Sequence, residues 1–211
     1  MTCPLEASTA HQFDIAICGG AFDPFSIAHE ILGLITHAQT GYEFWYMPCY
    51  SHRFAKKMAS PGHRLNMCER VIQNMGDWAK VSSFEIERCH DGSTFDSLVE
   101  LKKTYPNYRF HLVVGMDNFN EIEAKWHRGV ELISQNSFIV IGRAGHPLRD
   151  KAIERPNVFY IDFHFTCSST DIRAYIENGE YEIATRHMKP QVKEYIAKFG
   201  LYGWGEKNAK V

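Results

Sequence analysis

The most informative part of the chain is the segment Ile15-Ala-Ile-Cys-Gly-Gly-Ala-Phe-Asp-Pro-Phe-Ser-Ile-Ala-His-Glu30. The apolar run from Phe13 to Cys18 predicts a buried strand. A glycine pair and Asp23-Pro24 interrupt it, and apolar residues then return at helical spacing from Ile27 to Ile35. This pattern indicates a strand, a glycine-rich turn and a helix. In an α/β sheet such a turn lies at the carboxyl end of the strand, where ligands bind.

The turn has the chemistry of a phosphate site. Gly19 and Gly20 allow backbone amides to approach an anion without interference from a Cβ atom. His29 falls in the first turn of the helix, where its ring and the positive end of the helix dipole can meet the same phosphate. A simpler interpretation stays open, namely an ordinary strand–helix turn with a hydrogen-bonded histidine.

The segment from Gly19 to His29 resembles the GGTFDPxHxGH signature of the HxGH nucleotidyltransferases. It departs from that signature at Ala21, Ser26 and Ala28, which replace Thr, the first His and Gly. The resemblance implies that His29 and Ser26 act on the transferred phosphate, because a hydroxyl can still donate one hydrogen bond. It also implies ATP-binding roles for His29 and for Gly19, Gly20, Ala21, Phe22 and Asp23.

A second motif is Cys167-Ser168-Ser169-Thr170-Asp171-Ile172-Arg173. Hydroxyl residues at a helix start leave free backbone amides, and Arg173 lies one turn further on. The motif resembles ISSTxIR of the same family, which implies a catalytic role for Arg173. It further implies that the β and γ phosphates of ATP are bound by Ser168, Ser169, Thr170 and Arg173. The alternative is a well-capped helix with a surface arginine.

Three further stretches resemble the family's nucleotide-binding parts. Gly115-Met116-Asp117 resembles its G-x-D, which implies that Gly115 and Asp117 lie near the adenosine; a carboxylate capping the next turn is the alternative. Gly92 to Leu98 resembles SYTxDTL, which implies that Thr94 holds the pyridine substituent, whereas the residues alone indicate only a helix cap. Lys125-Trp126 resembles the Lys/Thr-Trp whose tryptophan stacks on the pyridine ring, although Trp126 could instead anchor a helix to the core.

The basic stretch from His52 to Lys57 predicts an exposed loop after the second strand. We expect Lys56 or Lys57 to contact the phosphate of a mononucleotide or pyrophosphate, and we assign Lys57 to the mononucleotide. A solvated charge run is the alternative.

Composition excludes several classes of protein. The chain has 211 residues, 45% apolar content and a net charge of −2, which does not favour nucleic-acid or membrane-surface binding. Its six cysteines form no CxxC pair and no metal-ligand spacing, so we expect free thiols and no protein-held metal. There is no apolar run of membrane-spanning length and no signal-peptide pattern, and the expected location is the cytoplasm.

Alternating strands and helices predict a single-domain α/β fold, a Rossmann-like doubly wound parallel sheet with right-handed crossovers. Strands are expected at 13–18, 42–47, 79–82 with an extension through Phe84 and Ile86, 109–114, 137–141 and 158–161. Helices are expected from residue 27, over 61–75, from Ser93 to Tyr105, ending at Leu132-Ile133, and over 168–178 and 190–199. Residues 142–157 are expected to form a surface loop. We divide the chain into a leader (1–12), a nucleotidyltransferase domain (13–203) and a tail (204–211).

The resemblance extends from Phe13 to about Tyr202 and is strongest to nicotinate-nucleotide adenylyltransferases. It implies transfer of AMP from ATP to nicotinate mononucleotide, or also to nicotinamide mononucleotide, with Mg²⁺ bridging the phosphates. The expected partners are these small molecules, and a homo-oligomer is compatible with the sequence. Two alternatives remain, an enzyme similar to pantetheine-phosphate adenylyltransferase and a non-catalytic nucleotide-binding regulator in which Ser26 marks lost turnover.

Overall fold

A computed structural model describes residues 13–51, 58–142, 155–163 and 168–205. They form one sheet of six parallel strands in the order β3-β2-β1-β4-β5-β6. The strands are β1 (Phe13–Gly20), β2 (Glu43–Pro48), β3 (Ala79–Val81), β4 (Tyr108–Gly115), β5 (Ser137–Ile141) and β6 (Val158–Ile161). The order reverses between β1 and β4, so the carboxyl end of β1 lies at the switch point of a doubly wound sheet. The predicted fold class is confirmed.

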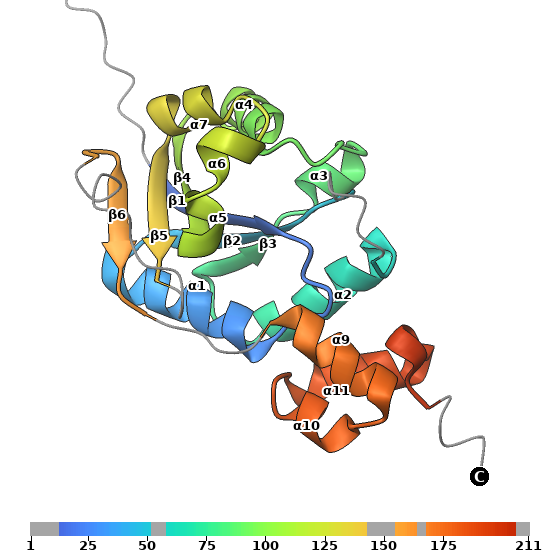
Figure 1. The fold of residues 1–211 in the computed structure, drawn as a ribbon. Helices are drawn as coiled ribbons and strands as arrows, with labels where there is room; N and C mark the ends of the chain where they lie inside the picture. The colour runs from blue at the N-terminus through green and yellow to red at the C-terminus, as the bar shows by residue number, and fades with distance from the viewer. Residues whose placement is uncertain (1–12, 52–57, 143–154, 164–167, 206–211) are drawn as a thin grey trace, which may run out of the picture.

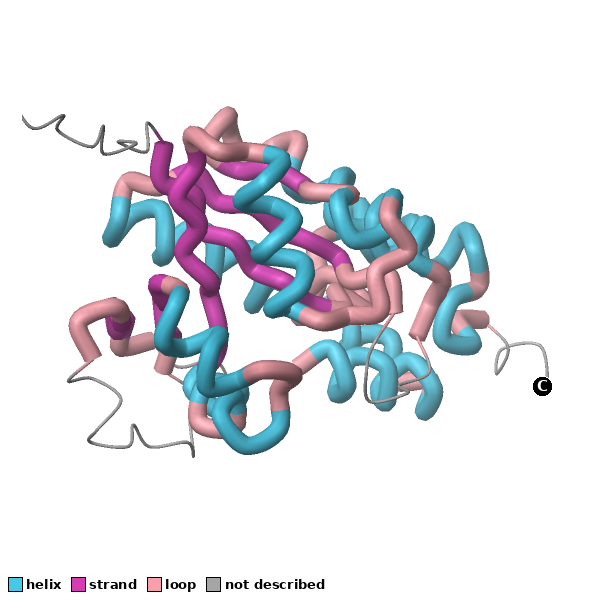
Figure 2. Tube along the Cα trace, turned by 90° about the horizontal axis from the view of Figure 1, so that it is seen from above, coloured by secondary structure: helices cyan, strands magenta, loops and turns pink. Residues whose placement is uncertain are grey.

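Helices cover both faces of this sheet, as Figures 1 and 2 show. One buried core contains side chains of α1 (Ile27–Thr40), α2 (Pro61–Ile72), α9 (Ser169–Asn178), α10 (Tyr181–Thr185) and α11 (Pro190–Phe199). The other contains those of α3 (Phe84–Glu87), α4 (Thr94–Thr104), α5 (Met116–Phe119), α6 (Ile122–Lys125) and α7 (Gly129–Gln135). β1 serves both cores, with Ala16 and Cys18 on one face and Ile15 and Ile17 on the other. Burial on both faces explains why residues 15–18 of this strand form a continuous apolar run.

Serine caps and glycine ends set the helix boundaries. The side chains of Ser26, Ser60, Ser93 and Ser168 cap the starts of α1, α2, α4 and α9. At the other end, Gly179 follows α9 with a φ of 82°, a left-handed conformation that glycine adopts without strain. The predicted bounds of α11 are confirmed, with Pro190 at its start and left-handed Gly200 after its end. Those of β5 and β6 are confirmed as well.

The predicted extension of the third strand is wrong. β3 ends at Val81, and Phe84–Glu87 forms the short helix α3 instead. The alternation of Phe84 and Ile86 indicates a strand, but Glu85 between them is buried, and its carboxylate accepts a 2.6 Å hydrogen bond from Ser97 of α4. A helical turn buries both Phe84 and Glu85, which a two-residue repeat would place on opposite sides. The predicted helix over 61–75 also ends earlier, at Ile72.

The C-terminal segment packs on the C-terminal helices. A 3₁₀ turn, η1 (Leu201–Gly203), follows α11. Beyond it, the ring of Trp204 lies 4.6 Å from that of Tyr181, and the Gly205 amide donates a 3.1 Å hydrogen bond to the Tyr181 hydroxyl. The expected leader, most of the 142–157 loop and the end of the tail fall outside the described residues. Within the described part of the chain, no helix is both long and apolar enough to cross a membrane.

Candidate active site

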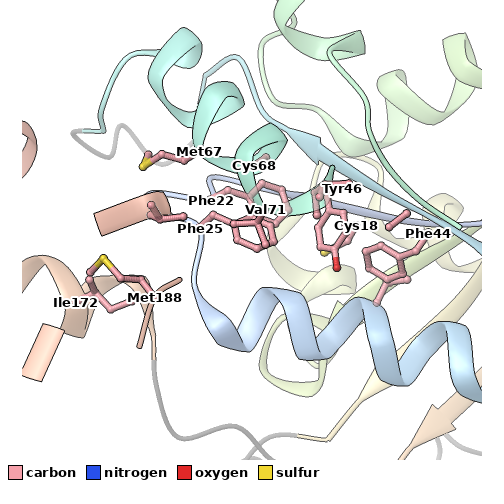
Figure 3. Close-up of a cluster of buried hydrophobic side chains, with 14 of the residues drawn as sticks. Cys18, Phe22, Phe25, Phe44, Tyr46, Met67, Cys68, Val71, Ile172 and Met188 are labelled. Atoms are coloured by element: carbon pink, nitrogen blue, oxygen red, sulfur yellow. The ribbon is translucent and has the colours of Figure 1, made fainter. Parts of the chain in front are cut away.

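His29 lies in the first turn of α1, directly after the glycine-rich turn. Its ring is half-buried against Phe22 and Phe25, with ring centroids 4.9 and 5.3 Å away. These rings belong to the first core, shown in Figure 3. Burial lowers the pKa of His29 to about 4, so the imidazole is neutral near pH 7. The backbone amide of Ser26 donates a 3.0 Å hydrogen bond to Nδ1, which places the single ring proton on Nε2.

Ser26 is the N-cap of α1 and is only 2% exposed. Its Oγ accepts a hydrogen bond from the His29 amide at 3.4 Å and lies 3.1 Å from Nδ1 of the His29 ring. The residue therefore helps to orient His29. The expected direct contact between the Ser26 hydroxyl and a phosphate stays a prediction.

The start of α9 docks on the β1–α1 turn, so the two strongest sequence motifs meet in space. Arg173 Nη1 donates to the backbone carbonyl of Asp23 at 2.6 Å, and Arg173 Nη2 donates to Thr170 Oγ1 at 3.2 Å. Ser169 Oγ donates to the carbonyl of Pro24 at 2.9 Å. Ser168 caps the helix, with its Oγ accepting from the Asp171 amide at 3.2 Å. The predicted juxtaposition of these motifs is therefore present, with the α9 amides next to the glycine turn.

Asp23 is an internal anchor, with 1% of its surface exposed. Its Oδ1 accepts hydrogen bonds from the Tyr202 hydroxyl at 2.6 Å and from the Ala59 amide at 3.2 Å. Its Oδ2 lies 3.8 Å from Nη1 of Arg173. One carboxylate thus joins the glycine turn to α9, to the segment before α2 and to the C-terminal turn. Its predicted contact with ATP remains a prediction.

The remaining predicted ATP-binding residues lie at the ends of β1 and β4. Gly19 is exposed and Gly20 is half-buried, where β1 runs beside β2. Gly115 ends β4, and a Cβ atom there would lie 2.5 Å from Oδ1 of Asp117. Only glycine at position 115 therefore leaves space for the Asp117 carboxylate in this position.

The two predicted pyridine-binding elements are joined to each other. Thr94 is the first residue of α4, and half-buried Trp126 follows α6. His127 Nε2 lies 3.8 Å from Oδ2 of Asp96, and the Arg128 guanidinium lies 4.0 Å above the Phe95 ring. These contacts place the Trp126 turn against the start of α4, as the resemblance implies. Trp126 also packs against the second core, so its anchoring role is present as well. Lys57 and the rest of the 52–57 stretch lie outside the described residues.

Arg64 is a residue that sequence reasoning missed. It is fully buried, with 0% exposure, in the first turn of α2. It donates to the carbonyls of Ala21, Cys49 and Ala59 at 2.9, 2.6 and 3.0 Å. Its burial could have been predicted from its position, because residues 64, 68, 71 and 72 have the spacing of one buried helix face. An arginine in such a stripe indicates a buried polar function.

Comparison with known proteins is consistent with this geometry. The family model described as Cytidylyltransferase-like matches residues 17–175. A protein named "Probable nicotinate-nucleotide adenylyltransferase" from Anaeromyxobacter sp. (strain K) is 34% identical over 194 residues, covering 90% of this chain and 96% of that protein. One of the same name from Desulfitobacterium hafniense (strain Y51) is 32% identical over 201 residues, covering 89% and 95%.

Solved structures show the same fold. The "Plasmodium falciparum nicotinic acid mononucleotide adenylyltransferase complexed with NaAD" superposes with a TM-score of 0.79 at 24% identity, covering 92% of this chain and 99% of that one. Together with the motifs and the relatives above, these findings show that the chain belongs to the cytidylyltransferase-like family and, within it, to the nicotinate-nucleotide adenylyltransferases.

Proposed function

We propose that the protein transfers AMP from ATP to nicotinate mononucleotide, forming the adenine–nicotinate dinucleotide and releasing pyrophosphate. The observation that carries this proposal is the docking of the α9 start on the glycine turn. There Arg173 and Ser169 bond to the carbonyls of Asp23 and Pro24, beside the neutral His29. We assign the donors of both motifs to the phosphates of one ATP molecule, as transfer from a nucleoside triphosphate requires.

The proposed step needs no nucleophilic side chain. A phosphate oxygen of the mononucleotide attacks the α-phosphorus of ATP and forms a new P–O bond. The bond from that phosphorus to the oxygen bridging to the β-phosphorus breaks, and pyrophosphate leaves with the electron pair. Because phosphate is already a nucleophile at neutral pH, the protein acts by positioning and by stabilising charge on the phosphoryl oxygens.

His29 and Arg173 have hydrogen-bond donors that suit the phosphate oxygens of ATP. In the neutral tautomer of His29, Nε2 donates one hydrogen bond, which we assign to oxygens around the α and β phosphates. The guanidinium of Arg173 has five N–H donors and stays partly exposed beside Ser169 and Thr170. We assign its remaining donors, with the adjacent α9 amides, to the pyrophosphate part of ATP.

Magnesium is proposed to arrive with the nucleotide. Among the described residues, no three His, Cys, Asp or Glu side chains come together as a metal site. We therefore assign Mg²⁺ to phosphate oxygens and water, as the sequence comparison with the family implies. No step of the proposed mechanism passes through a protein-held metal.

The α4 start is proposed to select the acid over the amide. The amides of Thr94 and Phe95 are the first two of a helix, where no intrahelical acceptor exists, while Ser93 Oγ accepts from the Asp96 amide. The Asp96 carboxylate, which would repel the acid, lies 3.8 Å from His127. A carboxylate accepts from donors at both oxygens, whereas an amide presents its own N–H to one of them. Lys57 is proposed to bind the mononucleotide phosphate.

The test is pyrophosphate release from ATP and Mg²⁺ with three acceptors in parallel: nicotinate mononucleotide, nicotinamide mononucleotide and 4′-phosphopantetheine. We expect nicotinate mononucleotide to give the highest kcat/KM, by roughly 10–150-fold over the amide, from the cost of one mispaired buried polar group. If 4′-phosphopantetheine were the preferred acceptor, the protein would instead be similar in activity to pantetheine-phosphate adenylyltransferase. ATP binding without turnover on any acceptor would indicate a regulator. A cytoplasmic location and a homo-oligomer remain predictions from the sequence.

A further inference from the structure

Arg64 is a buried cation that donates to four backbone carbonyls and, at 3.9 Å, to the Cys49 sulfur. Its Nε donates to Ala59 O at 3.0 Å, its Nη1 to Ala21 O at 2.9 Å, and its Nη2 to Cys49 O and Tyr50 O at 2.6 and 3.2 Å. Within the described part of the chain, no carboxylate lies within ion-pair distance of its guanidinium. Burying a charge without a counter-ion is costly, and a hydrophobic side chain of similar volume would avoid that cost. We therefore expect the buried guanidinium of Arg64 to have a role besides packing.

The carbonyl of Ala21 is the partner that matters for the site. It belongs to the peptide that links Ala21 to Phe22 in the glycine turn, and this peptide is trans. In a trans peptide the C=O and N–H groups point in opposite directions. Because Arg64 holds the carbonyl on the protein side, the Phe22 amide faces away from Arg64. Among the described residues it has no hydrogen-bond acceptor.

The backbone of Phe22 is held in a conformation that it would not adopt freely. Its φ is +49°, in the left-handed region that residues with a side chain rarely adopt. The ring is 2% exposed and packs against Phe25 and His29, so the side chain is fixed in the core. Ring packing fixes one side of this peptide and the Arg64 hydrogen bond fixes the other.

We propose that Arg64 is a positioning residue for the adenylyl transfer, holding the Ala21–Phe22 peptide so that the Phe22 amide donates to an ATP phosphate beside His29. This inference rests on the proposed function for its ligand. The guanidinium also places a fixed positive charge behind the turn, which favours an anion on the opposite side. Its bonds to Cys49, Tyr50 and Ala59 brace the turn against the end of β2 and the start of α2.

The test compares Arg64→Lys with Arg70→Lys, which changes an exposed arginine on the same helix. Lysine keeps the charge but lacks the planar fork that reaches carbonyls on three segments. We expect Arg64→Lys to weaken binding of α,β-methylene-ATP, measured by calorimetry, by about tenfold or more, the scale of one charge-assisted hydrogen bond. The KM for the mononucleotide is expected to change by less than about twofold, whereas general loosening of the fold would raise both. Arg70→Lys is expected to leave both values unchanged.

The wild-type protein gives a second measurement that does not depend on the stability of a variant. In ¹H–¹⁵N spectra, the Phe22 amide resonance is expected to move downfield when α,β-methylene-ATP binds. A Phe22 amide that is unmoved at saturation, or an Arg64→Lys protein that binds the analogue as wild type does, would overturn the inference. The calorimetric and NMR measurements of analogue binding need no turnover. A wild-type protein that binds the analogue but makes no dinucleotide would therefore contradict the proposed function, whereas the role of Arg64 in aiming the Phe22 amide at an ATP phosphate is tested by binding of the analogue alone.

Discussion

At the scale of single residues, the protonation of His29 is the feature most open to direct measurement. Burial against Phe22 and Phe25 lowers its pKa from the usual 6.5 to about 4, and the Ser26 amide occupies Nδ1. Between these two pKa values the unfolded chain binds a proton that the folded protein does not. The free energy of unfolding is therefore expected to fall as the pH drops from about 6.5 to 4, by at most ~3 kcal/mol from this residue.

Long-range ¹H–¹⁵N NMR checks both parts of this prediction. The spectrum at pH 7 is expected to show a neutral ring with its proton on Nε2, and the ring is expected to begin to titrate only below about pH 5. A midpoint near 6.5 would show that the ring is solvated, and a proton on Nδ1 would contradict the hydrogen bond that the Ser26 amide donates to it.

Removal of the His29 ring tests its catalytic role. His29→Ala is expected to lower kcat by ~10²–10³, the scale of losing one donor to the transition state. Circular dichroism should show a folded protein, since the half-buried ring lies at the edge of the core rather than inside it. A variant with nearly the wild-type rate would exclude His29 from the chemistry.

Two roles for Ser26 lead to different results for Ser26→Ala. A direct phosphate donor would cost ~10²–10³ in kcat, whereas an N-cap costs ~1 kcal/mol of stability, or about 2–4 °C in Tm. We expect the second result, with kcat reduced less than about tenfold, because the backbone amide of residue 26 still holds Nδ1 of His29. Ser60→Ala is the matched control, since Ser60 caps α2 and is exposed. It is expected to lower Tm by a similar amount with kcat unchanged.

At the scale of elements, the C-terminal turn is tied to the phosphate site through Asp23. The Tyr202 hydroxyl donates to Asp23 Oδ1 at 2.6 Å, while Arg173 lies 3.8 Å from Oδ2. Tyr202→Phe is expected to cost ~2 kcal/mol, about 4–8 °C in Tm, because a buried hydrogen bond to a charged group is lost. The freed carboxylate should also attract Arg173 away from the phosphates and raise the KM for ATP about fivefold, equivalent to ~1 kcal/mol.

Tyr181→Phe is the control for this prediction. It removes a hydroxyl of the same C-terminal region that accepts from the Gly205 amide. Its effect on the KM for ATP should be negligible. An unchanged KM in both variants would confine Tyr202 to a stabilising role.

The elements that sequence could predict are those with local signals. Serine caps and glycine ends placed α4, α9 and α11, and apolar runs placed the strands. Sequence signals of this kind are weak or absent at the short helices α3, α5, α6 and α10, none of which has a side-chain cap. Their conformation depends on tertiary contacts instead. Glu85 shows this directly, since its hydrogen bond to Ser97 joins α3 to α4 and overrides an alternating pattern that indicates a strand.

At the scale of the whole molecule, the fold brings distant motifs into one site. The glycine turn and the α9 start are about 150 positions apart in sequence, and Arg173 bonds to Asp23. The family resemblance implied that the two motifs lie close together, since both are expected to bind ATP. The topology agrees, because the turns that follow parallel strands lie at the same edge of the sheet. The resemblance did not reveal that Asp23 is an internal anchor or that Arg64 braces the turn from behind. The helical spacing of Arg64 indicates its burial, but the sequence does not show which carbonyls Arg64 reaches or that the Ala59 amide and the Tyr202 hydroxyl donate to Asp23.

The most direct test of the central claim is the stoichiometry of the complete reaction. Purified protein is incubated with ATP, Mg²⁺ and nicotinate mononucleotide, and the products are separated by liquid chromatography and identified by mass spectrometry. We predict the adenine–nicotinate dinucleotide and pyrophosphate in equal amounts, with the dinucleotide almost absent from the His29→Ala reaction. ADP or free phosphate as the nucleotide product, or no dinucleotide from the folded wild-type protein, would contradict this prediction.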